Sequence, residues 1–216
     1  MDWLQQLDAT VFRFINQTLS NPLFDKLMPF LSGNVFFAPA VVIAAFLMIW
    51  KDRLRGGLCV LMLALIVWPG DSFITDPIRD TIRRPRPFVT MPETRLPAGH
   101  GGKLGMPSSH AANWGAATMI LFIYYRRSLW ITAPLAFAVC FSRVYNGVHY
   151  PGDVLAGSML GASYAAILVF TFDAVWRWLG RMLFPSFLGK LPTLIARQPS
   201  TRPGNRENSA DETPQT

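Results

Sequence analysis

The stretch Ser142 to Asp153, SRVYNGVHYPGD, places an arginine, a histidine and an aspartate between two apolar runs of the chain. These runs, 129–144 and 154–176, are apolar enough to enter a bilayer, where charged and imidazole groups are costly unless they have a function. Two further strings have the same setting: RDTIRRPRP at 79–87 and PSSH at 107–110. Together the three strings predict an anion site at a membrane face.

The composition predicts a membrane protein. Hydrophobic residues make up 51% of the 216 residues and charged residues only 15%, which is too little polar surface for a soluble domain. The apolar runs are 34–50, 56–75, 111–125, 129–144 and 154–176. A helical span needs about 20 mostly apolar residues, so the third and fourth runs qualify only with flanking residues. We expect an all-α bundle of about five transmembrane helices.

The two ends of the chain differ from the central region, 33–190, which we expect to form the transmembrane domain. Residues 1–32 predict an amphipathic helix that lies either in the membrane interface or on the bundle. Its apolar face comprises Trp3, Leu4, Leu7, Val11, Phe14 and Ile15, and its polar face comprises Asp2, Gln5, Asp8 and Arg13. This segment lacks the basic region of a cleavable signal peptide. Residues 191–216 are polar and proline-containing, which is typical of a disordered tail.

Basic loops predict the orientation in the membrane. Three loops, after the first, third and fifth runs, carry Lys51, Arg53, Arg55, Arg126, Arg127, Arg177, Arg181 and Lys190. Short basic loops lie on the cytoplasmic side, so parity places 76–106 and the turn 145–152 outside. The loop 76–106 is also basic, which conflicts with this rule unless its arginines bind a ligand. We expect the N-terminus and the candidate site outside and the C-terminus inside.

The formal net charge of +7 is explained by membrane topology and anion binding. No nucleic-acid motif accompanies the basic residues, which gather at the ends of the apolar runs, so we expect no nucleic-acid partner. Cys59 and Cys140 lie inside apolar runs, and no Cys/His spacing is typical of a metal site. We expect neither a disulfide nor a bound metal.

The first string predicts a row of guanidinium groups. Arg79, Arg83 and Arg86 have i, i+4, i+7 spacing, which would align them on one helix face. The prolines that follow should end this helix near Arg84, leaving Arg86 on an extended turn. Guanidinium forks suit phosphate oxygens, although membrane anchoring or headgroup contact is an equally good explanation of this string alone.

The second string predicts a helix N-terminus. Ser108 or Ser109 is a natural N-cap for the third apolar helix, and free amides at such an end favour anions. His110 lies in this first turn. An ordinary cap beside a surface histidine is the simpler alternative for this string by itself.

The third string predicts a paired histidine. His149 and Asp153 are four residues apart, and Pro151 suits the start of the last helix, so the carboxylate should face the imidazole. A carboxylate bonded to one ring nitrogen leaves the other free to attack. Arg143 adds a guanidinium group, which a merely structural His–Asp pair would not explain.

Parity brings the three strings to one membrane face, and their residue types predict phosphoryl transfer without a metal. We expect His149 to be the nucleophile, with Asp153 as its orienting partner, and His110 to be the general acid. Arginines would stabilise charge on the phosphoryl oxygens.

The three strings resemble the motifs of the type 2 phosphatidic acid phosphatase (PAP2) family, whose fold vanadium haloperoxidases share. The family pattern is Lys, six residues, Arg-Pro; then Pro-Ser-Gly-His; then Ser-Arg, five residues, His, three residues, Asp. This chain has Arg79 in place of the lysine and Ser109 in place of the glycine. The resemblance covers about 33–176 and implies a PAP2-like helical core.

The resemblance also implies roles and substrates. The catalytic residues would be His149, His110, Asp153 and Arg143, and the phosphate-binding residues would be Arg79, Arg86, Ser108, Ser109 and Arg143, with no cofactor. Family substrates include undecaprenyl diphosphate, phosphatidylglycerol phosphate, phosphatidate and lipid A phosphates. The run GGKLGMPSSHAAN at 101–113 is similar to bacterial members that act on undecaprenyl diphosphate or lipid A. The expected location is the bacterial inner membrane, with the site on the periplasmic face.

Two alternatives to a phosphatase stay open. A lipid phosphotransferase would use the same phosphohistidine with an acceptor hydroxyl in place of water, and a non-enzymatic protein would only hold lipid headgroups. The oligomeric state is not predicted, because the small residues at Gly157 and Gly161 suit packing within a monomer or between two copies. His100 matches no family position and is expected at the surface.

Overall fold

The computed structural model describes residues 3–99 and 101–195, and this part of the chain is helical with no β-strand. The elements in order are α1 (Trp3–Arg13), η1 (Phe14–Thr18), α2 (Pro22–Ser32), α3 (Asn34–Gly70), η2 (Asp71–Thr75), α4 (Asp76–Ile82), α5 (Pro87–Thr90), α6 (Ser109–Tyr124), η3 (Arg126–Ser128), α7 (Leu129–Tyr145), α8 (Pro151–Leu183) and α9 (Pro185–Lys190). The predicted all-α class is confirmed. His100 and most of the predicted tail, 196–216, lie outside the described residues.

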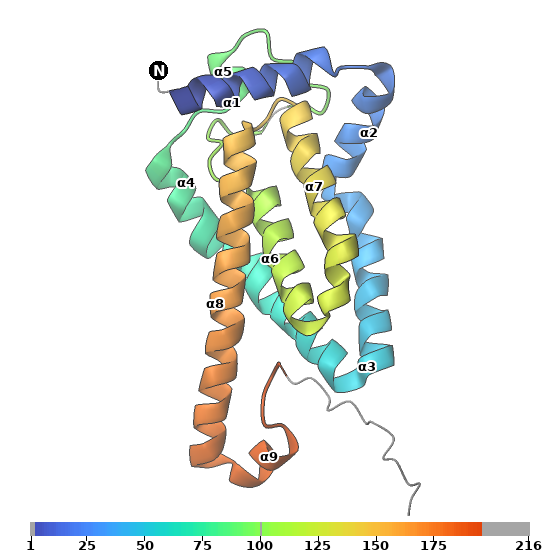
Figure 1. Cartoon of the computed structure of the whole chain (residues 1–216), viewed down its shortest axis with the longest axis vertical. Coiled ribbons are helices and arrows are strands. Elements are labelled where there is room, and N and C mark those ends of the chain that lie inside the picture. Colours follow the sequence, from blue (N-terminus) through green and yellow to red (C-terminus); the bar gives the residue numbers. More distant parts are fainter. Residues whose placement is uncertain (1–2, 100, 196–216) are drawn as a thin grey trace, which may run out of the picture.

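Helix α3 contains the first two apolar runs and bends sharply between them. The backbone leaves helical geometry at Asp52 (φ −116°, ψ 19°) and Arg53 (φ 30°, ψ −94°). The two limbs, 34–51 and 54–70, therefore run in opposite senses along the bundle (Figure 1). The second limb continues through η2 into α4, which carries the first string toward the end where the N-terminus lies.

Three helices are long and apolar enough to cross a membrane: Phe37–Ile82, Arg126–Tyr145 and Pro151–Leu183. The first of them includes the bend of α3. Helix α6 has only 16 residues, about 24 Å at 1.5 Å per residue, and falls short of this length. The membrane helix bundle is confirmed, whereas the number of five crossings stays a prediction.

Helices α6 and α8 form the closest contact in the bundle because small residues face each other. A Cβ atom at Gly161 would lie 1.9 Å from the carbonyl oxygen of Ala112, and one at Gly115 would lie 2.4 Å from that of Ser158. At Gly157 the carbonyl oxygen of Ser108 would be 2.5 Å away. The small residues of α8 thus allow helix packing within the chain, and they hold the start of α6 against α8.

Helix α1 lies across one end of the bundle, and α9 lies at the opposite end (Figure 1). Ala9 and Phe12 of α1 are buried against the bundle, whereas Trp3, Leu4 and Leu7 are exposed. Of the two alternatives for this helix, the structure shows packing on the bundle, with an apolar surface left on its outer side. Asp8 was expected on a polar outer face, but its side chain points inward, because it pairs with an arginine described below.

Candidate active site

The three strings meet at the end of the bundle that α1 covers. The Arg79 side chain on α4 donates from Nε to the carbonyl oxygen of Pro107 at 3.2 Å and from Nη2 to Ser109 Oγ. The backbone amide of Ser108 donates to the carbonyl oxygen of Asp153 at 3.1 Å. Segments far apart in the sequence therefore share one site, at the N-terminal ends of α6 and α8.

His149 and Asp153 are the most deeply buried groups of the site, with side chains 2% and 0% exposed. His149 lies in the turn between α7 and α8, and Asp153 is in the first turn of α8, which begins at Pro151. Their nearest atoms, Nδ1 and Oδ2, are 3.6 Å apart. This is ion-pair range but longer than a hydrogen bond, so the predicted bond between them is not formed at this distance.

Burial decides the protonation state of His149. It lowers the pKa of the imidazole to about 4, because desolvation disfavours the charged ring; Asp153 opposes the shift and the arginines Arg86 and Arg143 add to it. The ring is therefore neutral at neutral pH, and a nucleophilic imidazole requires this form.

Asp153 is held by contacts to both of its oxygens. Oδ2 accepts from the backbone amide of Tyr150 at 2.9 Å, completing a capping box at the start of α8. Oδ1 accepts from Arg84 Nη1 at 2.8 Å. The carboxylate is thus fixed in orientation before any substrate contact is considered.

His110 is half-buried at the second position of α6, and the charges of Arg143, His149 and Arg86 act on it. Ser108 is the N-cap residue of α6, but its side chain does not cap the helix. Its Oγ is buried and has no hydrogen-bond partner among the described residues. The first amides of α6 also lack an acceptor within the helix, as in any helix. The start of α6 therefore offers unused donors.

Four arginines lie around this start, and they divide into two pairs. Arg79 and Arg84 are neutralised: Arg79 Nη1 lies 2.6 Å from Asp76, and Arg84 bridges Asp153 and Asp8. Their pairing leaves little capacity for a further anion.

Arg86 and Arg143 have no carboxylate within ion-pair distance in the described part of the chain. Arg86 Nε donates to the carbonyl oxygen of Leu104 at 2.8 Å, and Arg143 Nη1 donates to Ser32 Oγ. Arg143 Nε is buried without a partner among the described residues. Burial and the charge of Arg79 lower the pKa of Arg86. These two guanidinium groups are the free cations of the site.

The structure corrects the expected row of arginines. Helix α4 ends at Ile82, one residue before Arg83, which takes a left-handed conformation (φ 54°, ψ 28°). Its exposed side chain donates to the carbonyl oxygen of Asp80. Arg83 therefore points away from the site, and Arg84 takes the inner position. The helix cannot continue, because the residue before Pro85 is excluded from helical geometry.

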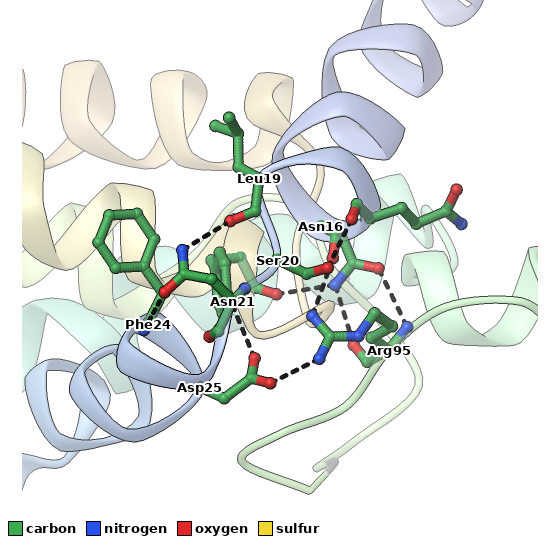
Figure 2. A network of polar contacts seen from close by, with 9 residues as sticks. Asn16, Leu19, Ser20, Asn21, Phe24, Asp25 and Arg95 are labelled. Carbon is green, nitrogen blue, oxygen red and sulfur yellow. Dashed lines mark hydrogen bonds and ion pairs between the residues drawn. The ribbon is translucent and has the colours of Figure 1, made fainter.

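The loop between α5 and α6 closes over the site and is anchored at a second point. A Cβ atom at Gly105 would lie 2.8 Å from Asp153 Oδ2, so the loop touches the carboxylate directly. Figure 2 shows the anchor, in which Asn16 and Asp25 bind Arg95. Asn16 Nδ2 donates to the carbonyl oxygens of Arg95 (2.9 Å) and Tyr145 (2.7 Å).

Sequence reasoning missed Arg84 and Asp8. The signal for Arg84 was the double arginine before Pro85, but the i, i+4 spacing favoured its neighbour. Asp8 had no signal of its own, because its contact depends on how α1 docks. Among the described residues no group of three or more His, Cys, Asp or Glu side chains could hold a metal ion.

Comparisons with known proteins agree with this geometry. The model of the PAP2 superfamily matches residues 57–177. The chain is 29% identical over 171 residues to the lipid A 4'-phosphatase of Bacteroides thetaiotaomicron, covering 74% of this chain and 75% of that protein. It is 28% identical over 171 residues to the bacitracin transport permease protein BcrC of Bacillus licheniformis, covering 77% and 81%.

A solved structure shares the fold. It is the crystal structure of the PAP2-type phosphatidylglycerolphosphate phosphatase from Bacillus subtilis, which matches with a TM-score of 0.59 and 24% identity. The match covers 80% of this chain and 87% of that one. The helical arrangement is therefore that of a known membrane phosphatase fold.

Proposed function

We propose that this chain, which belongs to the PAP2 superfamily, hydrolyses the phosphate of a membrane lipid through a phosphohistidine intermediate. One observation carries the proposal: Arg86 and Arg143 are two half-buried cations without a carboxylate partner, next to the neutral imidazole of His149. Like charges held together in a partly buried site are unfavourable unless an anion binds between them. A phosphate group fits both guanidinium forks.

In the proposed reaction His149 attacks phosphorus through Nε2. The bond between phosphorus and the lipid oxygen breaks, and His110 donates a proton to that oxygen. Asp153, 3.6 Å from Nδ1, stabilises the positive ring that forms. A water molecule then attacks the phosphohistidine, His110 takes up its proton, and the N–P bond breaks to release inorganic phosphate.

The remaining site residues bind the phosphoryl oxygens. Arg86 and Arg143 provide the main charge, and Ser108 Oγ and the first amides of α6 donate hydrogen bonds. Arg79 has a lesser part than the resemblance implies, because Asp76 already neutralises it and its Nη2 donates to Ser109 Oγ. We assign Arg79 and Ser109 to shaping the same phosphate site.

The substrate is proposed to be a lipid phosphate or diphosphate of a bacterial inner membrane, bound from the periplasmic side. The site lies at one end of a helix bundle with exposed apolar faces, so a lipid tail can remain in the bilayer. The named activities of two similar proteins, toward lipid A and phosphatidylglycerol phosphate, support this class. The run 101–113 favours undecaprenyl diphosphate and lipid A phosphates within it.

The proposal is tested by phosphate release from purified protein in detergent. The panel contains undecaprenyl diphosphate, lipid A, phosphatidylglycerol phosphate and phosphatidate, with His149→Ala as the inactive variant. We expect release from at least one lipid, a loss of at least about 10³-fold in kcat for His149→Ala, inhibition by orthovanadate and no effect of EDTA. Folded wild-type protein that releases phosphate from none of these lipids would contradict the proposal. Labelled phosphate found on an acceptor lipid would identify a phosphotransferase.

A further inference from the structure

One arginine joins the N-terminal helix to the carboxylate beside the candidate nucleophile. Arg84 Nη1 donates to Asp153 Oδ1 at 2.8 Å, and its Nη2 donates to Asp8 Oδ2. The other oxygen of Asp8, Oδ1, accepts from the backbone amide of Gly152 at 2.7 Å. The Asp8 side chain is only 12% exposed. A single guanidinium group therefore bridges a carboxylate of α1 and a carboxylate of α8.

The bridge is tightly enclosed. A Cβ atom at residue 152 would lie 2.9 Å from Asp8 Oδ2, so the glycine allows the carboxylate to approach the start of α8. The Arg84 guanidinium lies over the Tyr150 ring, 4.4 Å from its centroid, and Phe12 packs edge-on against the same ring at 5.4 Å. The Arg84 side chain is thereby confined between α1 and the first turn of α8.

The bridge gives the two oxygens of Asp153 different tasks. Oδ1 is occupied by Arg84, while Oδ2 binds the Tyr150 amide and faces His149 Nδ1 at 3.6 Å. Without Arg84 the carboxylate loses the contact that opposes its rotation about the Cβ–Cγ bond. Its alignment with the imidazole would then vary, and misplacement by about 1 Å can lower a rate by about 10²-fold.

We propose that Asp8 is a positioning residue of the reaction, acting through Arg84 to hold Asp153 in line with His149. This inference rests on the proposed function of the site. Residue 8 lies outside residues 57–177, which the PAP2 model matches, so α1 adds a part that the matched region does not contain. The N-terminal helix is then a component of the active site as well as a cover for the bundle end.

The test compares Asp8→Asn, Arg84→Met and the double variant in the phosphate-release assay. Asparagine keeps an oxygen for the Gly152 amide but removes the charge that faces Arg84. We expect kcat to fall about tenfold for Asp8→Asn and about 100-fold for Arg84→Met, with KM changed less than about twofold. The double variant should be no slower than Arg84→Met, because Asp8 acts through Arg84. Arg84→Lys should recover part of the loss.

Two exposed neighbours provide matched controls: Asp80→Asn and Arg83→Met should keep wild-type kcat. A kcat of Asp8→Asn within twofold of wild type would overturn the inference, and so would a double variant whose loss equals the product of the two single losses. A raised KM with unchanged kcat would also overturn it. If Arg84→Met does not fold, Asp8→Asn and Arg84→Lys decide alone. Wild-type protein inactive toward every lipid would overturn the proposed function itself.

Discussion

Arg86 and Arg95 belong to the same stretch of chain between α4 and α6, yet their electrostatic surroundings are opposite. Arg95 lies 2.7 Å from Asp25, and this hydrogen-bonded pair raises the pKa of Arg95. Arg86 has only the carbonyl oxygen of Leu104 as an acceptor, and burial together with the charge of Arg79 lowers its pKa. One arginine is compensated within the protein and the other is not.

The contrast extends to the groups around each arginine. In the Arg95 network both carboxylate oxygens of Asp25 are used, one by Arg95 and one by the Tyr145 hydroxyl at 2.7 Å (Figure 2). At the site, buried atoms of Ser108, Arg143 and His149 lack partners among the described residues. Buried polar groups are normally satisfied. A fully paired network therefore indicates a structural anchor, and an unpaired cluster indicates a place where a ligand binds.

The largest expected effect comes from removing the uncompensated charges. Arg86→Met and Arg143→Met should each lower kcat/KM by about 10² to 10³-fold, because each removes a charge that stabilises the phosphoryl oxygens. Arg95→Met should lower it by less than about threefold. Steady-state phosphate release measures all three variants. Equal losses for Arg95→Met and Arg86→Met would break the comparison.

Protonation of His149 gives the next effect. Its folded pKa of about 4 is below the ordinary value of 6.5, so the unfolded chain binds more protons between these values. The free energy of unfolding should therefore decrease as pH falls from about 6.5 to 4 and level off below. Thermal unfolding of wild type and His149→Gln across this range measures the difference. A wild-type curve that matches His149→Gln between pH 6.5 and 4 would show that the buried ring is not neutral.

Arg79 should have an intermediate effect. Arg79→Lys keeps the charge beside Asp76 but cannot reproduce the contacts to both Pro107 and Ser109, so we expect a loss of about three- to tenfold in kcat/KM. The same change at Arg86 should cost more. A greater loss at Arg79 than at Arg86 would show that ion pairing in the protein does not predict which arginine binds phosphate.

The smallest effect on activity is expected at the anchor. Asn16→Ala leaves the Arg95 amide and two carbonyl oxygens without their side-chain partner, which should cost about 1–3 kcal/mol of stability. The rate at saturating substrate should stay within about threefold of wild type. Thermal unfolding and phosphate release measure the two quantities. Unchanged stability with lost activity would move this network into the site.

Much of the molecule could be predicted from its sequence. The apolar runs predict helices, because a bilayer leaves backbone groups no other way to be hydrogen-bonded. The family predicted from the three motifs is confirmed by the family model, and the motif residues His149, Asp153 and His110 lie together in the fold. Residue type and local spacing are enough for these inferences, since both are properties of a short segment.

Only the tertiary structure decided which charges are compensated. Arg83 and Arg84 are neighbours in the chain, but the end of α4 turns one outward and the other toward Asp8, 76 residues away in the sequence. The strength of a charge pair depends on the distance between its atoms and on the surrounding dielectric, and both are set by how α1 docks on α8. The sequence thus determined which chemical groups are present, and the packing of the helices determined which of them remain free to act.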